Sequence, residues 1–437
     1  MPRFEFYKSG AFTKLQEFFA GAAQTPVIGI DFGTRQVKLL QISGADNPTL
    51  IAAAACEVPD EFLSDPFKRL DWQMGKLAGL LKAGGFKGKR AAVSVPPCMM
   101  YCKHLQLSLP ENNAKDLVTA VIAESLGCDG RVLEVRHRVV ATGGSGKSEV
   151  LAMAVGRGLI HRMLAGLKGA GLEMVAMHPE PLAMLRSFDT VTRRDGDAEM
   201  SSVYLDIGAS GTRVLIAQGK APVFVKPIAI GGVTLDMLIR EQLKCTLGEA
   251  RAQRLAFAAR TTRAAEATAD ERVVATETVG STGALLLNAS VSSAGPTVGE
   301  AIDEAATHSS SMQLAAVLER RNQNAPSGYA PVREMVDQAP VHEAVEALAD
   351  EVAMCLRYHA ALFPGRRVER CYFVGGESAA GDMAAYVAKK LRMQAHIADP
   401  LARLARTGKQ RTPGVDFDVP QPGWAVAVGL CNGPTDL

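Results

Sequence analysis

Two stretches of the chain repeat one pattern, and they constrain the fold more than any other feature. In residues 29–38 (GIDFGTRQVK) and 205–213 (LDIGASGTR), an apolar strand ends in an aspartate and runs into a turn rich in Gly, Ser and Thr. Alternating apolar residues after each turn predict a returning strand, so each copy indicates a β-hairpin with a polar tip. One such hairpin alone is most simply an ordinary turn. Two matching copies favour a single site that is divided between two halves of the chain.

The tips have the chemistry of a phosphate site. Successive backbone N–H groups in a Gly- and Thr-rich turn can point inward and form an anion-binding nest. An aspartate at the end of a strand can hold a hydrated divalent cation. We therefore expect Asp31 and Asp206 to hold Mg²⁺ through water, and the tips to bind phosphate groups. The tip residues expected to do so are Gly33, Thr34, Gly208, Ser210, Gly211 and Thr212.

A third glycine turn, Gly375-Gly376, follows an apolar strand expected at 371–374 and precedes a helix. A turn without Cβ atoms lets an adenine or a ribose approach the backbone closely. A Gly-Gly pair before a helix is also ordinary turn chemistry. This turn therefore indicates a nucleotide site only in combination with the other two.

Glu180 precedes Pro181 where an expected strand gives way to a helix. Glu followed by Pro is a good start for a helix. A carboxylate at this place can also order the attacking water in phosphoryl transfer to water, and the two interpretations are compatible. We expect Glu180 to position that water.

A competing phosphate motif lies in residues 141–148 (ATGGSGKS), which end like a Walker A loop. The first position is Ala rather than Gly, and residues 149–155 have the pattern of a strand. A Walker A loop must lead into a helix, whose N-terminus binds the phosphate. We therefore expect an ordinary hairpin here. His359, on the apolar face of a long helix expected at 341–362, is similarly expected to be a core residue rather than a metal ligand.

Composition narrows the class of protein. A chain of 437 residues is long enough for two or more domains. A net charge of +2, without a clustered basic run, argues against a nucleic-acid-binding protein. No window reaches the ~18 consecutive apolar residues of a membrane span, and the N-terminus lacks a signal-peptide pattern, so we expect a cytoplasmic location. Eight scattered cysteines fit a reducing compartment and make a poor zinc site.

The order of expected elements gives an α/β fold of two lobes. Three strands, a helix and a strand make up the first lobe (26–97), and three strands and a helix open the second (201–437). A strand-helix-strand-strand unit (98–173) is inserted into the first lobe, which resumes at 174–200. Outside this plan are an aromatic-rich N-terminal segment (1–25), where we expect a short helix packed on its own domain, and a low-complexity insertion (261–338) that we expect to be mobile. The expected strands are 27–32, 37–43, 50–58, 91–95, 101–107, 134–141, 150–155, 174–177, 203–207, 214–218, 223–230, 371–374 and 395–398, and the expected helices are 67–82, 111–126, 159–170, 181–186, 231–244, 341–362 and 424–430.

In this order the motifs resemble those of the actin-like ATPase superfamily, whose fold has two ribonuclease H-like lobes. Residues 31–38 resemble its first phosphate motif, 206–213 its second and 373–378 its adenosine motif, while 180–181 and 424–430 resemble its connecting helices. Within the superfamily the likeness is to the PilM family of type IV pilus assembly proteins. That likeness lies in Gly29–Gly33 with Lys38, in 224–235, 248–250 and 348–358, and in 374–376. The inserted unit resembles the SHS2 subdomain of PilM and FtsA.

The resemblance implies an ATP-binding, inner-membrane-associated assembly scaffold that docks the cytoplasmic tail of a bitopic partner similar to PilN. ATP and Mg²⁺ are the implied cofactors, with Lys38 and Ser378 added to the nucleotide-binding residues. Three departures, Arg213, Gly211 and Glu377, argue that the protein is at most a slow actin-like ATPase. FtsA-like proteins end in a long linker and an amphipathic membrane helix, whereas this sequence stops seven residues after Leu430, an ending that favours the PilM family. An FtsA-like division or filament-forming protein, which would self-associate, and a carbohydrate kinase remain the alternatives.

Overall fold

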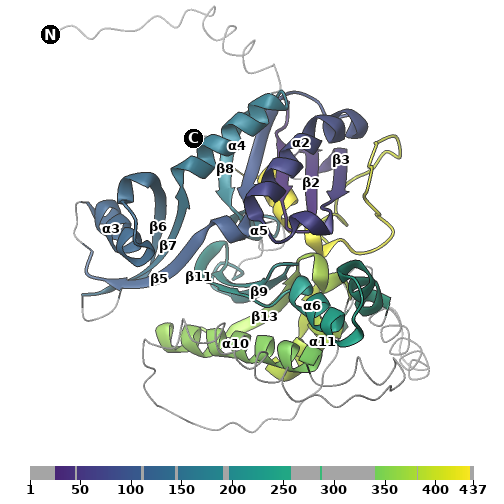
Figure 1. The fold of residues 1–437 in the computed structure, drawn as a ribbon. Helices are drawn as coiled ribbons and strands as arrows, with labels where there is room; N and C mark the ends of the chain where they lie inside the picture. Colours follow the sequence, from purple (N-terminus) through teal and green to yellow (C-terminus); the bar gives the residue numbers. More distant parts are fainter. Residues whose placement is uncertain are drawn as a thin grey trace, which may run out of the picture.

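The computed structural model describes residues 25–44, 47–109, 113–142, 146–189, 196–256, 286–287, 340–380 and 382–433. The expectations for residues 1–24 and, apart from 286–287, for the insertion 261–338 lie outside the described residues. The described residues form two lobes and a smaller unit at one side (Figure 1).

A five-stranded sheet of order β3-β2-β1-β4-β8 forms the first lobe. Its first three strands are the expected antiparallel meander, and β4 and β8 add in parallel. Helix α2 begins after the Asp65 cap, whose carboxylate accepts from two backbone N–H groups, and ends at Gly85 in the left-handed conformation. The bounds are β1 Ile28–Phe32, β2 Gln36–Ser43, β3 Thr49–Glu57, η1 Asp60–Phe62, α2 Pro66–Gly84, β4 Arg90–Val95, η2 Pro97–Met99, α4 Arg157–Gly169, β8 Glu173–Pro179 and α5 Glu180–Arg186.

The second lobe repeats this plan in a six-stranded sheet of order β11-β10-β9-β13-β14-β12. An antiparallel meander again comes first, and β13 pairs with β9 in parallel, as β4 pairs with β1. Helices α10 and α11 pack on one face of this sheet (Figure 1). The bounds are β9 Ser201–Ile207, β10 Thr212–Gln218, β11 Ala221–Ile228, α6 Gly232–Leu243, a helix at 247–256, β12 Leu286–Leu287, α10 Pro340–Leu362, β13 Val368–Val374, η5 Gly376–Ala380, α11 Asp382–Leu391, β14 Ala395–Ile397, η6 Pro422–Trp424 and α12 Ala425–Cys431.

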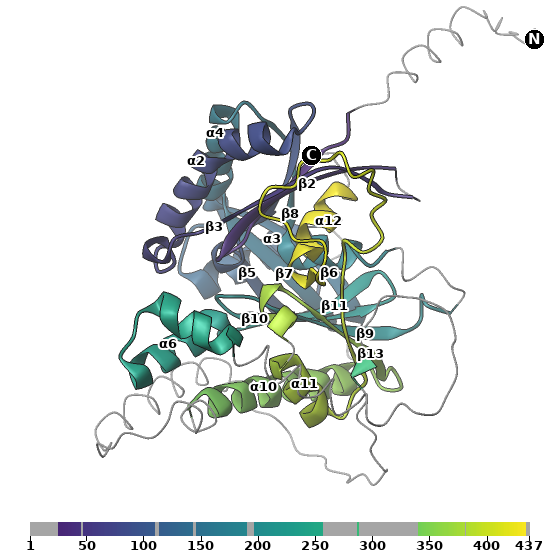
Figure 2. The same ribbon diagram turned by 90° about the vertical axis from the view of Figure 1, so that its right-hand side faces the viewer.

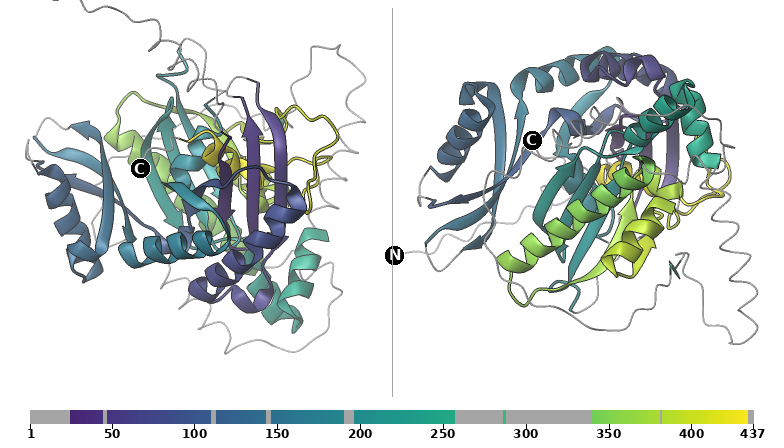
Figure 3. Two further views of the ribbon diagram at one scale, coloured as in Figure 1. Left: turned by 90° about the horizontal axis from the view of Figure 1, so that it is seen from above. Right: turned by 60° about the horizontal axis from the view of Figure 1, so that its bottom comes forward.

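The side unit is a three-stranded sheet of order β5-β7-β6 with α3 packed against it, and it lies beside both lobes (Figure 3). Its elements are β5 Tyr101–Leu107, α3 Ala114–Leu126, η3 Gly130–Val132, β6 Leu133–Thr142 and β7 Ser148–Gly156. The helix that follows β7 was expected to belong to this unit. In the structure that helix, α4, buries Leu159, Met163 and Leu167 against α2 in the core of the first lobe.

Two helices, α5 and α12, join the cores of the two large sheets, and α12 lies between the sheets (Figure 2). Their approach is so close that glycines are needed on two sides of α12. A Cβ on Gly429 would overlap the carbonyl oxygen of Ala183 in α5, and one on Gly29 in β1 would lie 2.7 Å from the carbonyl oxygen of Ala427. Real Cβ atoms do not approach that closely, so these two glycines set how closely α12 packs against α5 and β1.

We predict that Gly429→Ala lowers the free energy of unfolding by about 1–3 kcal/mol, because the added methyl group must push α12 away from α5. Urea unfolding followed by circular dichroism measures the change. The matched control is Gly79→Ala on α2, where a new Cβ meets no atom within 4 Å. There the better helix propensity of Ala should raise stability by about 0.5–1 kcal/mol. Equal effects of the two changes would contradict the close crossing.

Candidate functional site: the cleft between the lobes

The two repeated hairpin tips meet at a cleft between the lobes. The cleft has a volume of about 330 Å³ and is lined from both halves of the chain, by Asp31 and Thr34 on one side and Asp206 and Ser210 on the other. Thr34 Oγ1 and Ser210 Oγ are 2.9 Å apart and form a hydrogen bond across the cleft. The cavity falls in the size range of small-molecule sites. The expectation of one site divided between two halves therefore agrees with the geometry.

The first tip is held by side chains of its own lobe. The hydroxyl of Ser94 on β4 donates to Asp31 Oδ1 at 3.2 Å, and Lys38 Nζ lies 3.6 Å from Asp31 Oδ2. Gln73 of α2 donates to the carbonyl oxygen of Gly33 at 2.7 Å. Burial raises the pKa of Asp31, although Lys38 opposes the rise.

The second tip is held by the start of α6. The backbone N–H groups of Gly232 and Val233 donate to the carbonyl oxygens of Gly208 and Ala209 at 3.1 and 2.8 Å. The first turn of α6 therefore satisfies two of its free N–H groups with the tip itself.

Arg213 binds two carboxylates in the centre of the cleft. Its Nε and Nη2 atoms donate to Asp206 Oδ2 at 3.0 and 2.7 Å, and Nη2 also donates to Glu180 Oε1 at 2.9 Å. All three side chains are buried. Burial opposes the charge of Arg213, but Asp206 and Glu180 outweigh it and raise the pKa of the guanidinium. Burial raises the pKa of Glu180 to about 8, with Arg213 acting against the rise.

This donor set does not fit the expected hydrated Mg²⁺. Asp31 has a lysine partner, and Asp206 has an arginine that it shares with Glu180. A divalent cation at this place would have to displace or repel those cations. Within the described part of the chain there is also no group of three or more His, Cys, Asp or Glu side chains arranged to hold a metal ion. We therefore derive no chemistry from a metal here.

The third glycine turn also lines the cleft, but for a reason that sequence reasoning missed. Gly375 has φ +89°, and a Cβ there would overlap the carbonyl oxygen of Ile207 and Oδ1 of Asp206. Its glycine is thus required by the packing of β13 against β9. Gly376 is different, because a Cβ at this position would meet no atom within 4 Å. Gly376 therefore offers the open backbone that a nucleoside needs.

Not every expected site residue reaches the cleft. Those that line it are Asp31, Gly33, Thr34, Lys38, Glu180, Asp206, Gly208, Ser210, Gly375 and Gly376. Gly211, Thr212 and Ser378 are not among its lining residues. The hydroxyl of Thr212 donates to the carbonyl oxygen of Ile230 at 2.8 Å, that of Ser378 donates to Val374 at 2.5 Å, and Gly211 packs against Ile228. These three residues therefore stabilise the backbone around the cleft and do not line the cavity.

Sequence reasoning missed several lining residues, above all Arg213, Arg35 and Arg251. A signal for Arg213 was present, since it follows Asp206 by the same seven positions that separate Lys38 from Asp31. Arg251 comes from the helix at 247–256, and nothing in its surroundings marks it.

A chain of ion pairs, buried except at Asp60, runs beside the cleft. Arg35 of the first tip pairs with Asp60 and, at 3.1 Å, with Asp236 of α6. Asp236 accepts at 2.7 Å from Arg254, which pairs at 2.8 Å with Glu377 of η5. Glu377, which the resemblance places beside adenosine, is thus turned toward Arg254. The pairing of Arg35 with Asp236 links the two lobes directly.

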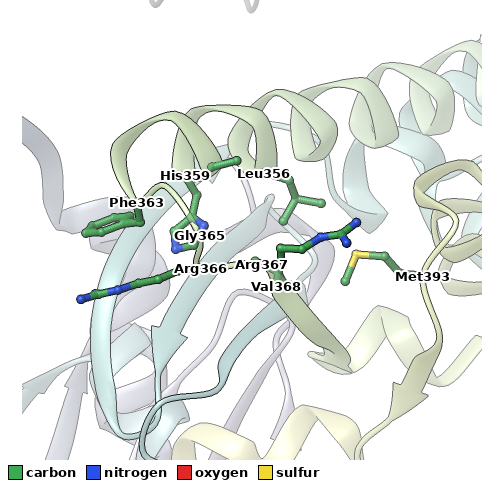
Figure 4. Close-up of a pocket in the computed structure, with 9 residues that line it drawn as sticks. Leu356, His359, Phe363, Gly365, Arg366, Arg367, Val368 and Met393 are labelled. Atoms are coloured by element: carbon green, nitrogen blue, oxygen red, sulfur yellow. The ribbon is translucent and has the colours of Figure 1, made fainter. Parts of the chain in front are cut away.

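Two other features lie away from this cleft. The segment that resembles a Walker A loop joins β6 and β7, which pair antiparallel, with Thr142 opposite Ser148, so the expectation of a hairpin is confirmed. A second cavity of about 210 Å³ lies at the end of α10, between His359 and Arg366 (Figure 4). His359 is buried as expected, but neither ring nitrogen has a hydrogen-bond partner among the described residues, and burial lowers its pKa.

Two repeated sheets, two connecting helices and a cleft between them define an actin-like fold. Neither family models nor curated proteins match the chain. Among solved structures, one described as "PilM-PilN type IV pilus biogenesis complex" is similar over 93% of this chain and 98% of its own, with a TM-score of 0.62 and 16% identity. At that identity the likeness establishes the fold.

Two further structures cover 93% of this chain at TM-scores of 0.39. They are the ethanolamine utilization protein EutJ from Carboxydothermus hydrogenoformans, with 13% identity over 88% of its length, and component A of (R)-2-hydroxyglutaryl-CoA dehydratase from Acidaminococcus fermentans, with 10% identity over 95%.

No helix in the described ranges has the length and apolar character needed to cross a membrane.

We predict that Asp236→Asn lowers the free energy of unfolding by about 3–5 kcal/mol, because it removes the charge that two buried arginines share. Chemical unfolding in urea measures the loss. Asp71→Asn is the matched control, since it removes an exposed partner of Arg162, and it should leave the unfolding midpoint unchanged. A D236N variant as stable as the D71N variant would show that the network does not hold the lobes.

Proposed function

We propose that this protein is a nucleotide-binding assembly scaffold of the PilM type, which serves a type IV pilus or a related secretion machine. In this proposal the chain binds ATP in the cleft and docks the cytoplasmic tail of a bitopic inner-membrane partner. It would be held at the inner membrane through that partner. The observation that carries the proposal is the convergence of two matching hairpin tips, from the two lobes, on one cavity of suitable size.

The cleft supports ATP through its charge and its backbone. Lys38 and Arg213 place two cations beside the two tips, and both line the cavity. A Cβ on Gly423 would lie 3.5 Å from Lys38 Nζ, so the ammonium group lies against η6, next to the open backbone of Gly376. In this proposal the phosphates lie between the tips and the nucleoside lies near Gly376.

The side unit supports the docking of a peptide. Strand β6 pairs with β7 alone among the described strands, so one of its edges is free. Val139 on this strand is 44% exposed, and Arg136 and Arg138 are exposed beside it. A free edge with an apolar contact and basic neighbours suits an extended peptide that adds a strand and carries acidic residues. The solved complex with a likeness to this chain pairs PilM with PilN by its description.

In this proposal the main role of the cleft is to bind ATP rather than to hydrolyse it. Glu180, the residue expected to position water, has its Oε1 atom held by Arg213, and its Oε2 atom is buried without a partner among the described residues. A carboxylate held in this way is a poor candidate for general base, so turnover of ATP should be slow at most.

We predict that Lys38→Ala weakens ATP binding at least about tenfold, because the phosphates lose one of two cations. Isothermal titration of ATP against the wild-type protein and the variant measures the change. The control is Lys390→Ala, which removes a cation on α11 that is paired with Glu346 outside the cleft. Equal affinity of the wild type and the K38A variant would place the nucleotide elsewhere.

We also predict that a synthetic peptide from the cytoplasmic tail of the cognate bitopic protein binds the ATP-loaded protein, and that Val139→Pro weakens this binding at least about tenfold. Proline removes the backbone donor and distorts the free edge of β6. Fluorescence anisotropy of the labelled peptide follows binding. The control is Leu164→Asp on α4, where Leu164 is 40% exposed. Aspartate is used there because proline would break the helix. A peptide that binds neither the wild type nor the L164D variant would contradict the docking proposal.

A further inference from the structure

The repeat in this protein includes a cation in each tip motif, and the cation of the second motif was not among the expected binding residues. Asp31 stands directly opposite Lys38 in the ladder between β1 and β2, and Asp206 stands directly opposite Arg213 in the ladder between β9 and β10. Residues opposite each other on one face of an antiparallel pair lie close enough for their side chains to interact. Each lobe therefore brings an aspartate together with its own cation.

The two pairs differ in how tightly the cation is held. Lys38 Nζ lies 3.6 Å from Asp31 Oδ2, beyond hydrogen-bond distance. Arg213 makes two contacts of 3.0 and 2.7 Å with one oxygen of Asp206 and a third of 2.9 Å with Glu180. Its guanidinium also lies against the second tip, because a Cβ on Gly208 would be 3.4 Å from Nη2. The planar guanidinium thus joins two carboxylates from two elements beside the expected phosphate position.

Each carboxylate in the centre of the cleft already has a cation of the chain beside it. Asp31 is paired with Lys38, while Asp206 and Glu180 share Arg213. A divalent cation near Asp206 would come within a few ångströms of the guanidinium, where like charges repel strongly in a partly dry interior. Phosphate oxygens face no such repulsion from Arg213 and Lys38.

We infer that Arg213 is a built-in cation that takes the place of a divalent metal in this cleft, so that the nucleotide is bound without a metal ion. The inference rests on the proposed ATP binding for its ligand, but the exclusion of a metal by Arg213 can be measured on the free protein. It predicts that binding does not depend on a metal, so that metal-free ATP and its Mg²⁺ complex bind with similar affinity.

The first experiment titrates ATP against the full-length wild-type protein, once with Mg²⁺ and once with EDTA. The two dissociation constants should agree within about threefold. Affinity lost by tenfold or more in EDTA would overturn the inference while supporting nucleotide binding. No binding of ATP in either buffer would contradict the proposed function and the choice of ligand together.

The second experiment needs no nucleotide, and it separates these failures. Mn²⁺ is titrated against the free protein and followed by its electron paramagnetic resonance signal. The wild type should bind no Mn²⁺ in the cleft, whereas Arg213→Gln, which keeps a planar hydrogen-bonding group without the charge, should gain one Mn²⁺ site. That new site should be lost in the double variant with Asp206→Asn. A wild-type Mn²⁺ site that Asp206→Asn removes would overturn the inference.

Two variants serve as controls in case the Arg213→Gln variant does not fold. Arg162→Gln removes an arginine outside the cleft and should behave as the wild type in both titrations. Arg213→Lys keeps a cation between the carboxylates, so it should also bind no Mn²⁺. If circular dichroism shows that Arg213→Gln does not fold, the wild-type titrations and Arg213→Lys still decide the question.

Discussion

The close crossing of α12 with its neighbours is the constraint on which the rest of this structure depends. Gly429 and Gly29 let the helix lie directly against α5 and β1, and residues of α5 and α12 share one core with residues of both sheets. The cleft lies beside this core, and there the hydroxyl groups of Thr34 and Ser210 meet. Close packing of a few backbone atoms therefore supports the elements that carry Asp31 and Glu180.

Charge is the second organising element, and it acts inside that frame. The cleft and the chain of ion pairs beside it hold a concentration of buried acids and bases that would be costly if any member stood alone. Each is therefore shared: Asp206 and Glu180 share Arg213, and Arg35 and Arg254 share Asp236. Such sharing makes the residues interdependent, so the cleft behaves as one unit rather than as a set of separate contacts.

Much of the fold could be predicted from sequence because it depends on local patterns. The meander of β1 to β3, the capped helix α2 and the second meander all follow from periodicity and turn residues. The site was less predictable, since it depends on where side chains point after folding. Thr212 and Ser378 turn to backbone carbonyl groups, and the partner of Arg213 on α5 lies 33 positions away in sequence. A local sequence pattern cannot predict a contact between residues that far apart in the chain.

The ion pair between Arg35 and Asp236 affects how often the two lobes separate rather than how tightly a ligand binds. The lobes cannot part on that side without separating the two charges inside a poorly hydrated region, so the energy cost falls on a single step instead of being spread over a gradual motion. An opening of this kind is a rare two-state event. Any exchange of the cavity's contents that requires this opening is limited by its frequency, and not by the strength of contacts inside the cleft.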